Sequence, residues 1–408
     1  MALPLSSRKQ GKMNLDLLQN MTGAAAALAT LPGTVELGML SIGSFLPAAS
    51  MTHRSCSHEK VRLAVVIPAH NERESIAACL DSLLRDNAAV GASIIVVADN
   101  CTDETAAIAV ARGVEVLERS SLTERGKGYA LNYAFRHLAA RDFDAYVIVD
   151  ADSVVPSGFL HAFKRTFVAG ADAAQCAYLV SNGDENDRTR LLDLALRAFN
   201  WIRPLGRARL GISAGILGNG FALRKQTLER VPYTAHSVVE DLEYHLALVE
   251  KGYTVTFIES TRIYGAMPAG GRGRETQRAR WEGGRLRMLR EHGLRLTRMI
   301  ATGRSAMVEP LLDLLLLPLG FHAMLLALAM LSSNATVRFV GLAGCIVVLL
   351  HVAAAMRRGP SLWEDLRVLA SVPRYVLWKL ARLPLIVTAS GRRAAWVRTE
   401  RAVEVENS

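Results

Sequence analysis

The 408-residue chain is poor in cysteine and in aromatic residues, and it lacks two common glycine motifs of nucleotide-binding folds. Its five cysteines are scattered and never form C-x-x-C; they are Cys56, Cys79, Cys101, Cys176 and Cys345. An odd, dispersed set excludes a disulfide scaffold and a zinc ribbon and indicates a reducing compartment. No G-x-G-x-x-G follows the first hydrophobic run and no Walker A motif occurs, so dinucleotide oxidoreductases and P-loop enzymes lose their main support.

Half of the residues are hydrophobic, and the net charge of +10 is unevenly distributed. A chain this apolar can bury enough surface to fold. Residues 63–261 carry 20 basic and 25 acidic side chains, whereas residues 262–304 carry 11 Arg and 3 Glu, and residues 357–401 carry 10 basic and 3 acidic ones. The excess thus lies in two belts around an apolar stretch, not on the main body where a nucleic-acid-binding protein would carry it. The pattern predicts contact with membrane lipids and no nucleic-acid partner.

The apolar stretch between the two basic belts is long enough for a transmembrane hairpin. Residues 310–331 contain one acid, Asp313, and are long enough to cross the hydrocarbon core. Residues 337–356 follow after a short polar gap and end at Arg357 and Arg358. The positive-inside rule places the arginines in the cytoplasm and the uncharged gap outside. A buried hairpin within a soluble domain is the alternative interpretation.

Two further segments have mixed membrane character. Residues 361–390 combine Trp363 and other aromatic residues with prolines and arginines, which favours interfacial helices and leaves a third span open. Residues 21–49 are apolar but contain Glu36 and Pro32, so a span, an interfacial hairpin and a signal-like segment all remain open.

Between these segments, hydrophobic runs alternate with helical patterns. The runs are residues 61–67 (ended by Pro68), 93–98, 114–117 and 145–149, and the helical patterns lie at 76–84, 103–112 and 128–140. This rhythm is typical of a doubly wound α/β sheet, in which ligands bind beyond the carboxyl ends of the strands.

Acidic residues follow three of the predicted strands. Glu72 comes after the first, Asp99 ends the second, and Asp150 and Asp152 follow the strand at 145–149. We expect these carboxylates to converge on one edge of the sheet, where they would offer hard oxygen ligands to Mg²⁺ or Mn²⁺ that also holds a diphosphate. A D-x-D pair by itself often merely faces solvent in a turn, but its position after a strand favours the binding site.

Six motifs in a fixed order carry a family resemblance. They are PAHNE (68–72), ADNCTDET (98–105), RGKGYALN (125–132), VDADS (149–153), VEDLEYHL (239–246) and QRARW (277–281). The set resembles the family 2 glycosyltransferases, most of all the membrane-bound branch that includes cellulose, chitin, hyaluronan and poly-N-acetylglucosamine synthases. The resemblance implies a GT-A fold with a mixed sheet, a nucleotide-diphosphate sugar donor (usually UDP), Mg²⁺ or Mn²⁺ as cofactor, and inversion at the anomeric carbon.

The resemblance also implies roles for individual residues. The catalytic set is Asp241, as the base, with Gln277, Arg280 and Trp281 of the Q-x-x-R-W motif beside the acceptor and the donor diphosphate. The donor-binding set is Pro68, Glu72, Asp99, Lys127 and Asp150. The metal ligands are Asp152 and Asp150.

These roles agree with the chemistry of an inverting transfer. One carboxylate must take the proton of the acceptor hydroxyl, and Asp241 can do so. A cation must stabilise the leaving diphosphate, which suits Arg280. As alternatives, Asp241 could be a helix-start acid favoured by the helix dipole, and Trp281 could be a membrane-interface residue.

The sequence therefore predicts a multi-pass inner-membrane (plasma-membrane) glycosyltransferase with a cytoplasmic catalytic domain. We expect an N-terminal tail with a membrane segment at 1–60, the GT-A domain at 61–295, and a transmembrane hairpin with a basic interfacial region at 296–408. The acceptor is a growing polysaccharide or a lipid-linked glycan. The alternative is a single addition to a lipid or polyprenyl phosphate. One hairpin has too few helices to enclose a sugar polymer, unless partner subunits or a homo-oligomer complete the pore. A non-catalytic nucleotide-sugar sensor is disfavoured, because all expected acids are present.

Overall fold

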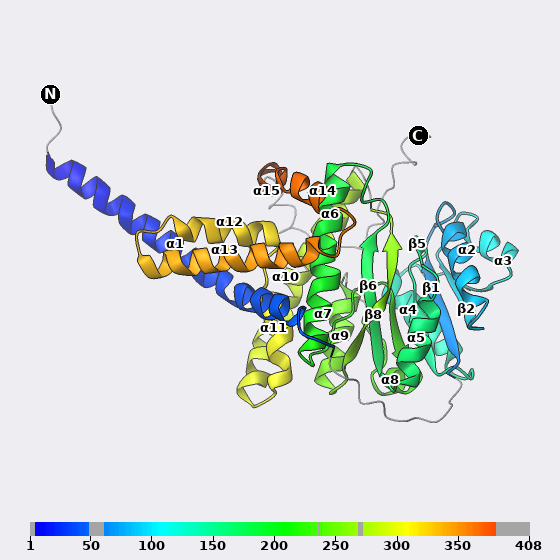
Figure 1. The fold of residues 1–408 in the computed structure, drawn as a ribbon. Helices are drawn as coiled ribbons and strands as arrows, with labels where there is room; N and C mark the ends of the chain where they lie inside the picture. The colour runs from blue at the N-terminus through cyan, green and yellow to red at the C-terminus, as the bar shows by residue number, and fades with distance from the viewer. Residues whose placement is uncertain (1–4, 49–60, 236, 238, 268–271, 381–408) are drawn as a thin grey trace.

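A mixed sheet forms the centre of the larger, catalytic part of the protein, and a helical stalk projects from one side of it (Figure 1). The computed structural model describes residues 5–48, 61–235, 237, 239–267 and 272–380. For residues 5–15, 272–282, 378 and 379 it describes the backbone and not the side chains. The sheet has eight strands in the order β3-β2-β1-β4-β7-β6-β8-β5. The strands are β1 (Leu63–Ala69), β2 (Ser93–Asp99), β3 (Glu115–Arg119), β4 (Ala145–Ile148), β5 (Ser153–Val154), β6 (Ala173–Val180), β7 (Phe221–Arg224) and β8 (Val255–Gly265).

The four strands predicted from the sequence form one half of this sheet. β1 pairs in parallel with β2 and β4, and β2 pairs in parallel with β3. β7 is antiparallel to both β4 and β6, so the sheet is mixed, which confirms the predicted fold class. One boundary was wrong: β1 continues through Pro68, which we expected to end it. The pairing of β1 with β4 ends at Val66, before Pro68 is reached. The missing N–H of Pro68 therefore removes no hydrogen bond between β1 and β4.

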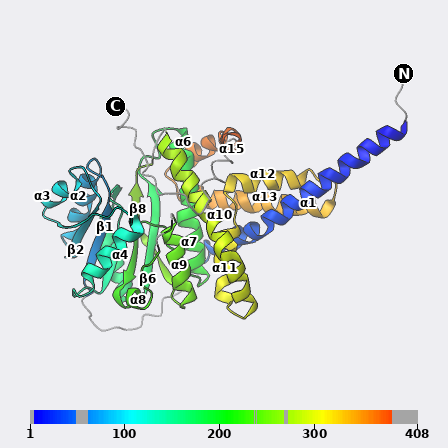
Figure 2. The same cartoon turned by 180° about the vertical axis from the view of Figure 1, so that it is seen from behind.

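Helices cover both faces of the sheet (Figures 1 and 2). Successive side chains of a strand point to opposite faces. Val65 accordingly packs in the core with α2 and α5, and Val66 packs in a second core with α4. Burial on both faces explains why the strands are continuously hydrophobic. The helices of this part are α2 (Ile76–Asn87), α3 (Thr105–Ala111), α4 (Lys127–Leu138), α5 (Phe159–Val168), α6 (Asp187–Arg197), a π-helical turn (Ala198–Ile202), α7 (Arg203–Arg209), α8 (Lys225–Arg230), α9 (Glu240–Glu250) and α10 (Arg272–Ala301).

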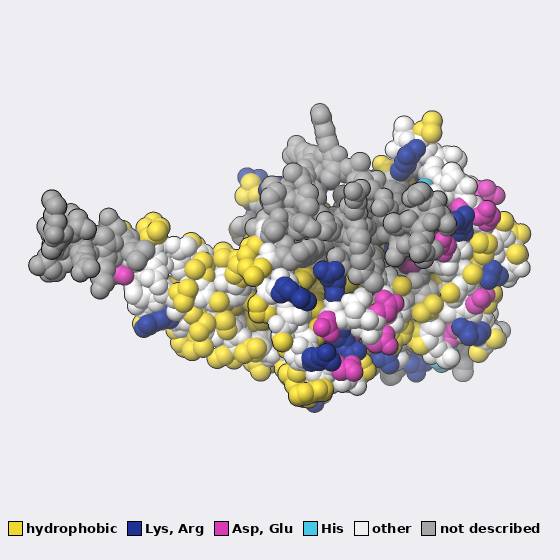
Figure 3. All heavy atoms as spheres, turned by 90° about the horizontal axis from the view of Figure 1, so that it is seen from above, with side chains coloured by type: hydrophobic (Ala, Val, Ile, Leu, Met, Phe, Trp, Pro, Cys, Tyr) yellow, Lys and Arg dark blue, Asp and Glu magenta, His cyan; other side chains and the backbone are white. Residues whose placement is uncertain are grey.

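The stalk consists of α1 (Leu5–Gly43), α12 (Leu319–Met330) and α13 (Ala335–Met356), which lie side by side (Figures 1 and 2). Two of its helical segments, Asp16–Gly43 and Ala335–Met356, are long and apolar enough to cross a membrane. Hydrophobic side chains gather over the stalk surface (Figure 3). The second segment matches the predicted span at 337–356. The first runs without a break through Pro32, which the sequence analysis counted against a span.

The other half of the predicted hairpin is not a straight helix. Residues 310–331 are divided between α11 (Val308–Leu315) and α12, which meet at an angle of 83°. Proline restricts the residue before it to extended conformations and cannot continue a helix. Leu316 is extended and ends α11, and Pro318, two residues further on, restricts Leu317 and directly precedes α12, so the helix stops and begins again. The segment expected to form the first half of the hairpin is therefore a bent pair of helices that together are apolar and long enough for one membrane segment.

Two close contacts fix the ends of the stalk to the catalytic part. A β-carbon added at Gly206 of α7 would lie 2.2 Å from the carbonyl oxygen of Leu40, so α1 and α7 touch through their backbones. Beyond the stalk, a 3-10 turn (Ser305–Met307) precedes α11, and α14 (Leu362–Leu369) and α15 (Val372–Leu380) follow α13. Arg197 of α6 donates two hydrogen bonds of 2.8 Å to the buried Asp365 of α14. Residues 381–390 of the predicted interfacial segment lie outside the described residues.

Candidate active site

The carboxyl ends of β1, β2 and β4 open into one cavity of about 1070 Å³. The predicted donor-binding residues, metal ligands and catalytic base all lie in the wall of this cavity. Its lining includes Pro68, Glu72, Asp99, Lys127, Asp150, Asp152 and Asp241. The expectation that the acids at the strand ends converge is therefore met, although Glu72 and Asp152 are 80 residues apart along the chain.

Two asparagines shape the loops at this edge. Asn71 and Asn100 have φ of 54° and 53°, in the left-handed region that asparagine tolerates better than most residues. The side-chain oxygen of Asn71 accepts a hydrogen bond of 2.7 Å from the backbone N–H of Thr102. That of Asn100 accepts one of 2.8 Å from the backbone N–H of Ser121. Each asparagine therefore ties its own loop to the next one, a role that sequence reasoning missed.

Asp99 is held in a buried ion pair. Its carboxylate lies 2.6 Å from Arg119, and each side chain is 7% exposed. Asp99 and Arg119 are register partners at the ends of β2 and β3, and Arg119 also contacts Glu124 at 2.8 Å. A buried carboxylate needs such a partner. Sequence reasoning missed Arg119, although its position at the end of a predicted strand was a usable signal.

Lys127 links two loops of the site. Its ammonium group pairs with the carboxylate of Asp150 and donates to the carbonyl oxygen of Gly218. Burial opposes its charge, but the nearby carboxylates, Asp150 first among them, outweigh burial and raise the pKa of Lys127. The backbone N–H of Asp150 donates to the side-chain oxygen of Asn219 at 3.0 Å. The glycine–asparagine–glycine turn at 218–220 thus fixes the D-x-D loop.

The D-x-D pair has the donor chemistry of a Mg²⁺ or Mn²⁺ site. Asp150 and Asp152 are half-buried, line the cavity and offer hard carboxylate oxygens. Among the described side chains, the one trio of acids with oxygens within 4.8 Å of one another lies elsewhere, at Glu36, Glu309 and Asp313, which are already paired with arginines. By the chemistry of their oxygens, Asp150 and Asp152 fit a hard divalent cation such as Mg²⁺ or Mn²⁺.

Asp241 lies at the first turn of α9, directly above the 218–220 turn. Its Oδ2 atom is 3.2 Å from the position of a β-carbon on Gly218, so any other residue there would make the carboxylate move by a few tenths of an ångström. Burial raises the pKa of Asp241. Burial and the neighbouring Asp241 together raise the pKa of Glu240 to about 7. A cavity-facing carboxylate with a raised pKa can act as a general base near neutral pH.

The Q-x-x-R-W motif lies in the first turns of α10, but the side chains of Gln277, Arg280 and Trp281 lie outside the described residues. The helix itself packs closely on the start of α9. A β-carbon on Gly284 would lie 2.4 Å from Val239, two residues before Asp241. The next described arginines of α10, at 285 and 287, line the cavity.

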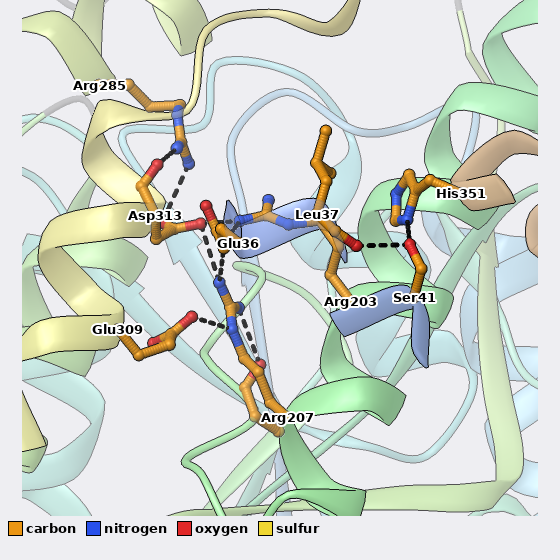
Figure 4. A network of polar contacts seen from close by, with 10 residues as sticks. Glu36, Leu37, Ser41, Arg203, Arg207, Arg285, Glu309, Asp313 and His351 are labelled. Carbon is orange, nitrogen blue, oxygen red and sulfur yellow. Dashed lines mark hydrogen bonds and ion pairs between the residues drawn. The ribbon is translucent and has the colours of Figure 1, made fainter. Parts of the chain in front are cut away.

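A second set of charges forms a buried network where the stalk meets the catalytic part (Figure 4). We call it the arginine–carboxylate network; it contains Glu36, Arg203, Arg207, Arg285, Glu309 and Asp313. Arg207 reaches Asp313 at 2.9 Å, and Arg285 reaches the other oxygen of Asp313 at 3.2 Å. Four elements, α1, α7, α10 and α11, contribute to it. In the sequence, Glu36 and Asp313 are isolated acids within apolar segments, and nothing near them indicates a partner. The network was therefore not predicted.

Comparisons with known proteins agree with this geometry. The family model described as "Glycosyltransferase like family 2" matches residues 61–284. The Bacillus subtilis (strain 168) protein named "Probable glycosyltransferase YdaM" is 26% identical over 246 residues, which are 55% of this chain and 56% of that protein, so the match spans about half of the relative's length. The solved mannosyltransferase PcManGT from Pyrobaculum calidifontis is 18% identical with a TM-score of 0.54, covering 93% of this chain and 99% of that one. The last likeness shows the same fold.

Proposed function

The chain belongs to the family 2 glycosyltransferases, and we propose that it transfers a sugar from a nucleoside-diphosphate donor, with inversion, to an acceptor at a membrane. It is a glycosyltransferase by family, as predicted. One observation carries the proposal: Asp99, Asp150 and Asp241 line a single cavity at the carboxyl ends of the strands. In open α/β sheets this is where ligands bind.

In the proposed donor complex, Asp99 contacts the base, which we take to be uracil, and Lys127 and Asp150 lie beside the diphosphate. Pro68 and Glu72 contribute the first loop. The solved Pyrobaculum calidifontis mannosyltransferase is described as a complex with GDP-Man and Mn²⁺, which supports a nucleotide-sugar donor and a divalent cation. Asp152 with Asp150 would hold Mg²⁺ or Mn²⁺, which neutralises charge on a leaving diphosphate when bound.

Asp241 is the proposed general base. It takes the proton of the acceptor hydroxyl while that oxygen attacks the anomeric carbon from the face opposite the diphosphate. The bond from that carbon to the acceptor oxygen forms, the bond to the diphosphate breaks, and the configuration inverts. By family resemblance, Arg280 assists the leaving group, and Gln277 and Trp281 contact the acceptor.

We further propose that α1 and α13 cross the plasma membrane, with the catalytic part, at about residues 61–295, in the cytoplasm. The uncharged turn between α12 and α13 then lies outside, and Arg357 and Arg358 lie at the cytoplasmic end of α13, as the positive-inside rule requires. The N-terminal helix and the region from 296 onward together form the membrane-bound part. The bent pair α11–α12 would make a third, interrupted segment.

The test uses the full-length protein in membranes with a panel of labelled nucleotide sugars, with and without Mn²⁺ or Mg²⁺, and compares it with Asp241→Asn. We expect label to move into a membrane-associated product only with the native protein and a divalent cation. High-mass product digestible by glycosidases would indicate a polysaccharide, and solvent-extractable product would indicate a lipid. No transfer from any donor, or an unimpaired Asp241→Asn protein, would contradict the proposal.

A further inference from the structure

The cavity of the active site extends well beyond the strand ends, to the membrane side of the protein. Its far end is lined by residues of the break between α11 and α12 and by three neighbouring helices. These include Leu317, Pro318 and Gly320 at the break, Leu37 of α1, His351 of α13 and Tyr375 of α15. The same cavity therefore connects the proposed base, Asp241, with helices that we place in the bilayer.

With α13 crossing the membrane as proposed above, the far end of the cavity lies near the middle of the bilayer. α13 has 22 residues, so it measures about 33 Å, close to the ~30 Å of a hydrocarbon core. α12 ends beside the outer turn and has only 12 residues, so its first residue, at the break, lies about 18 Å inward from that turn. Irregular backbone at membrane depth is tolerated only where protein buries it or a cavity reaches it. The break meets this condition, because residues 316–320 line the cavity.

The wall between the two ends is rich in guanidinium groups. Arg203, Arg207 and Arg285 line the cavity together with Asp313, the carboxylate they share, whereas Glu36 and Glu309 of the same network do not. Arg203 is 2% exposed, and its Nε atom has no hydrogen-bond partner among the described residues. Arginines of this kind suit phosphate oxygens, which accept paired hydrogen bonds.

The order of groups along the wall can be followed through their contacts. Gly218 lies against Asp241, and three residues earlier a β-carbon on Gly215 would lie 3.2 Å from the guanidinium of Arg207. Arg207 in turn contacts Asp313, three residues before Leu316 and the break. From the strand ends outward, the cavity therefore presents a base, then arginines, then the apolar residues of the break.

The stalk offers no comparable route for a polymer between its own helices. A β-carbon on Gly344 of α13 would lie 2.3 Å from Leu326 of α12, and one on Gly341 would lie 2.8 Å from the carbonyl oxygen of Leu326. A β-carbon on Gly23 of α1 would lie 2.9 Å from Ser332. Small residues let these helices pack in direct contact. Among the described helices, the stalk is thus a closed bundle.

We infer that the acceptor is a membrane lipid in which a phosphate joins a long apolar tail to a hydroxylated head, and that it enters sideways through the α11–α12 break; this inference rests on the proposed function. The tail stays in the inner leaflet, the phosphate lies against Arg203, Arg207 and Arg285, and the head reaches Asp241. The head hydroxyl gives its proton to Asp241 and its oxygen to the anomeric carbon, and the nucleoside diphosphate leaves.

The first experiment compares acceptors on the full-length protein in lipid nanodiscs. Three synthetic acceptors share one hydroxylated head: a long tail linked through phosphate, the same tail linked through a neutral ether, and a short tail linked through phosphate. We expect kcat/KM for the first to exceed the other two by about tenfold or more, as expected for losing charge-assisted hydrogen bonds or apolar contact. A phospholipid and a polyprenyl-diphosphate sugar, added as separate arms, distinguish the two natural sources of this chemistry.

The second experiment narrows the opening. Leu317→Trp should raise KM for the long-tailed acceptor about tenfold and KM for the short-tailed acceptor by a clearly smaller factor, because overpacking at the break acts mainly on the tail. Leu331→Trp makes the same change at the exposed outer end of the stalk, and it should leave KM for both the long-tailed and the short-tailed acceptor unchanged. Arg285→Gln should remove the preference for phosphate over ether, and Arg285→Lys should restore part of it.

The outcomes separate the two levels of the proposal. If no donor reacts with any acceptor, or if Asp241→Asn retains full activity, the proposed function itself fails. If transfer depends on Asp241 but the three acceptors react equally, or a soluble oligosaccharide reacts best, the function stands and the lipid acceptor is wrong. Equal effects of Leu317→Trp and Leu331→Trp would overturn the entry route.

Discussion

The strand-end site and the arginine–carboxylate network, two regions of one cavity wall, are built from charges in different ways. At the strand ends, the acids belong to short motifs that follow hydrophobic runs. Asp99 pairs with Arg119, and Asp150 pairs with Lys127. In the arginine–carboxylate network, by contrast, the partners come from four helices, and Glu36 and Asp313 are 277 residues apart in the sequence. The first arrangement serves chemistry and can be recognised locally. The second joins the stalk to the catalytic part, and it exists only in the folded chain.

The largest expected effect tests the strand-end site. Asp241→Asn keeps the shape of the side chain but removes the base, so we expect kcat to fall by roughly 10²–10⁴-fold. Nucleotide binding, measured by calorimetry, should stay close to native, because the donor contacts are unchanged. Glu229→Gln removes an equal charge at an exposed position and should have little effect. A similar loss in both variants would mean that the assay reports net charge or folding rather than the base.

The second prediction tests the network. Asp313→Asn leaves Arg203, Arg207 and Arg285 without their shared carboxylate. Removing one partner from a buried charge cluster costs about 3–5 kcal/mol, so the melting temperature of the detergent-solubilised protein should fall clearly. Asp142→Asn breaks an ion pair with Arg62 in which the side chain of Asp142 is 79% exposed, so this variant should change the melting temperature little. Equal melting temperatures for Asp313→Asn and the native protein would show that the network does not hold the stalk in place.

The same contrast explains what could be predicted from the sequence. Hydrophobic runs predicted β1 to β4, and the acids after them predicted a common edge, because parallel strands align their carboxyl ends. The family resemblance supplied Asp241 and Lys127. The sequence did not indicate that β7 inserts antiparallel between β4 and β6, since its four residues carry no distinctive pattern.

Membrane segments were harder to interpret for a related reason. Length and hydropathy suggested one span at 310–331, but Leu316 and Pro318 break it. Glu36 counted against a helix through the N-terminal segment, because an isolated acid in apolar surroundings is costly. Its contact with Arg203 removes that objection, and no local rule could have paired residues 167 positions apart. Long-range charge pairing is the information that single-sequence patterns lack.

A smaller expected effect tests how the strand-end site is held together. Gly218 has φ of +80°, and a β-carbon there would press on the carboxylate of Asp241 at 3.2 Å. We expect Gly218→Ala to lower kcat by roughly tenfold, because small displacements of a catalytic group are costly, with KM for the donor less affected. Gly211→Ala is the matched control, since it has φ of +72° and nothing within 4 Å of the added carbon. Both variants carry similar backbone strain, so a loss confined to Gly218→Ala isolates the contact with Asp241. Equal losses would assign the effect to strain alone.

The smallest effect concerns the pH dependence of the Glu240–Asp241 pair. A base must be ionised to accept a proton, so raising its pKa moves the acidic limb of kcat/KM upward. Burial raises the pKa of both carboxyls, that of Glu240 to about 7, and we expect activity to fall as the pH drops through the range just below neutrality. Glu240→Gln removes one negative charge beside Asp241, which makes ionisation of Asp241 easier, so the limb should move to lower pH. The measurement is a kcat/KM profile with saturating metal at each pH. A limb that stays in place in Glu240→Gln would mean that the two carboxyls titrate independently, and that burial alone sets the pKa of the base.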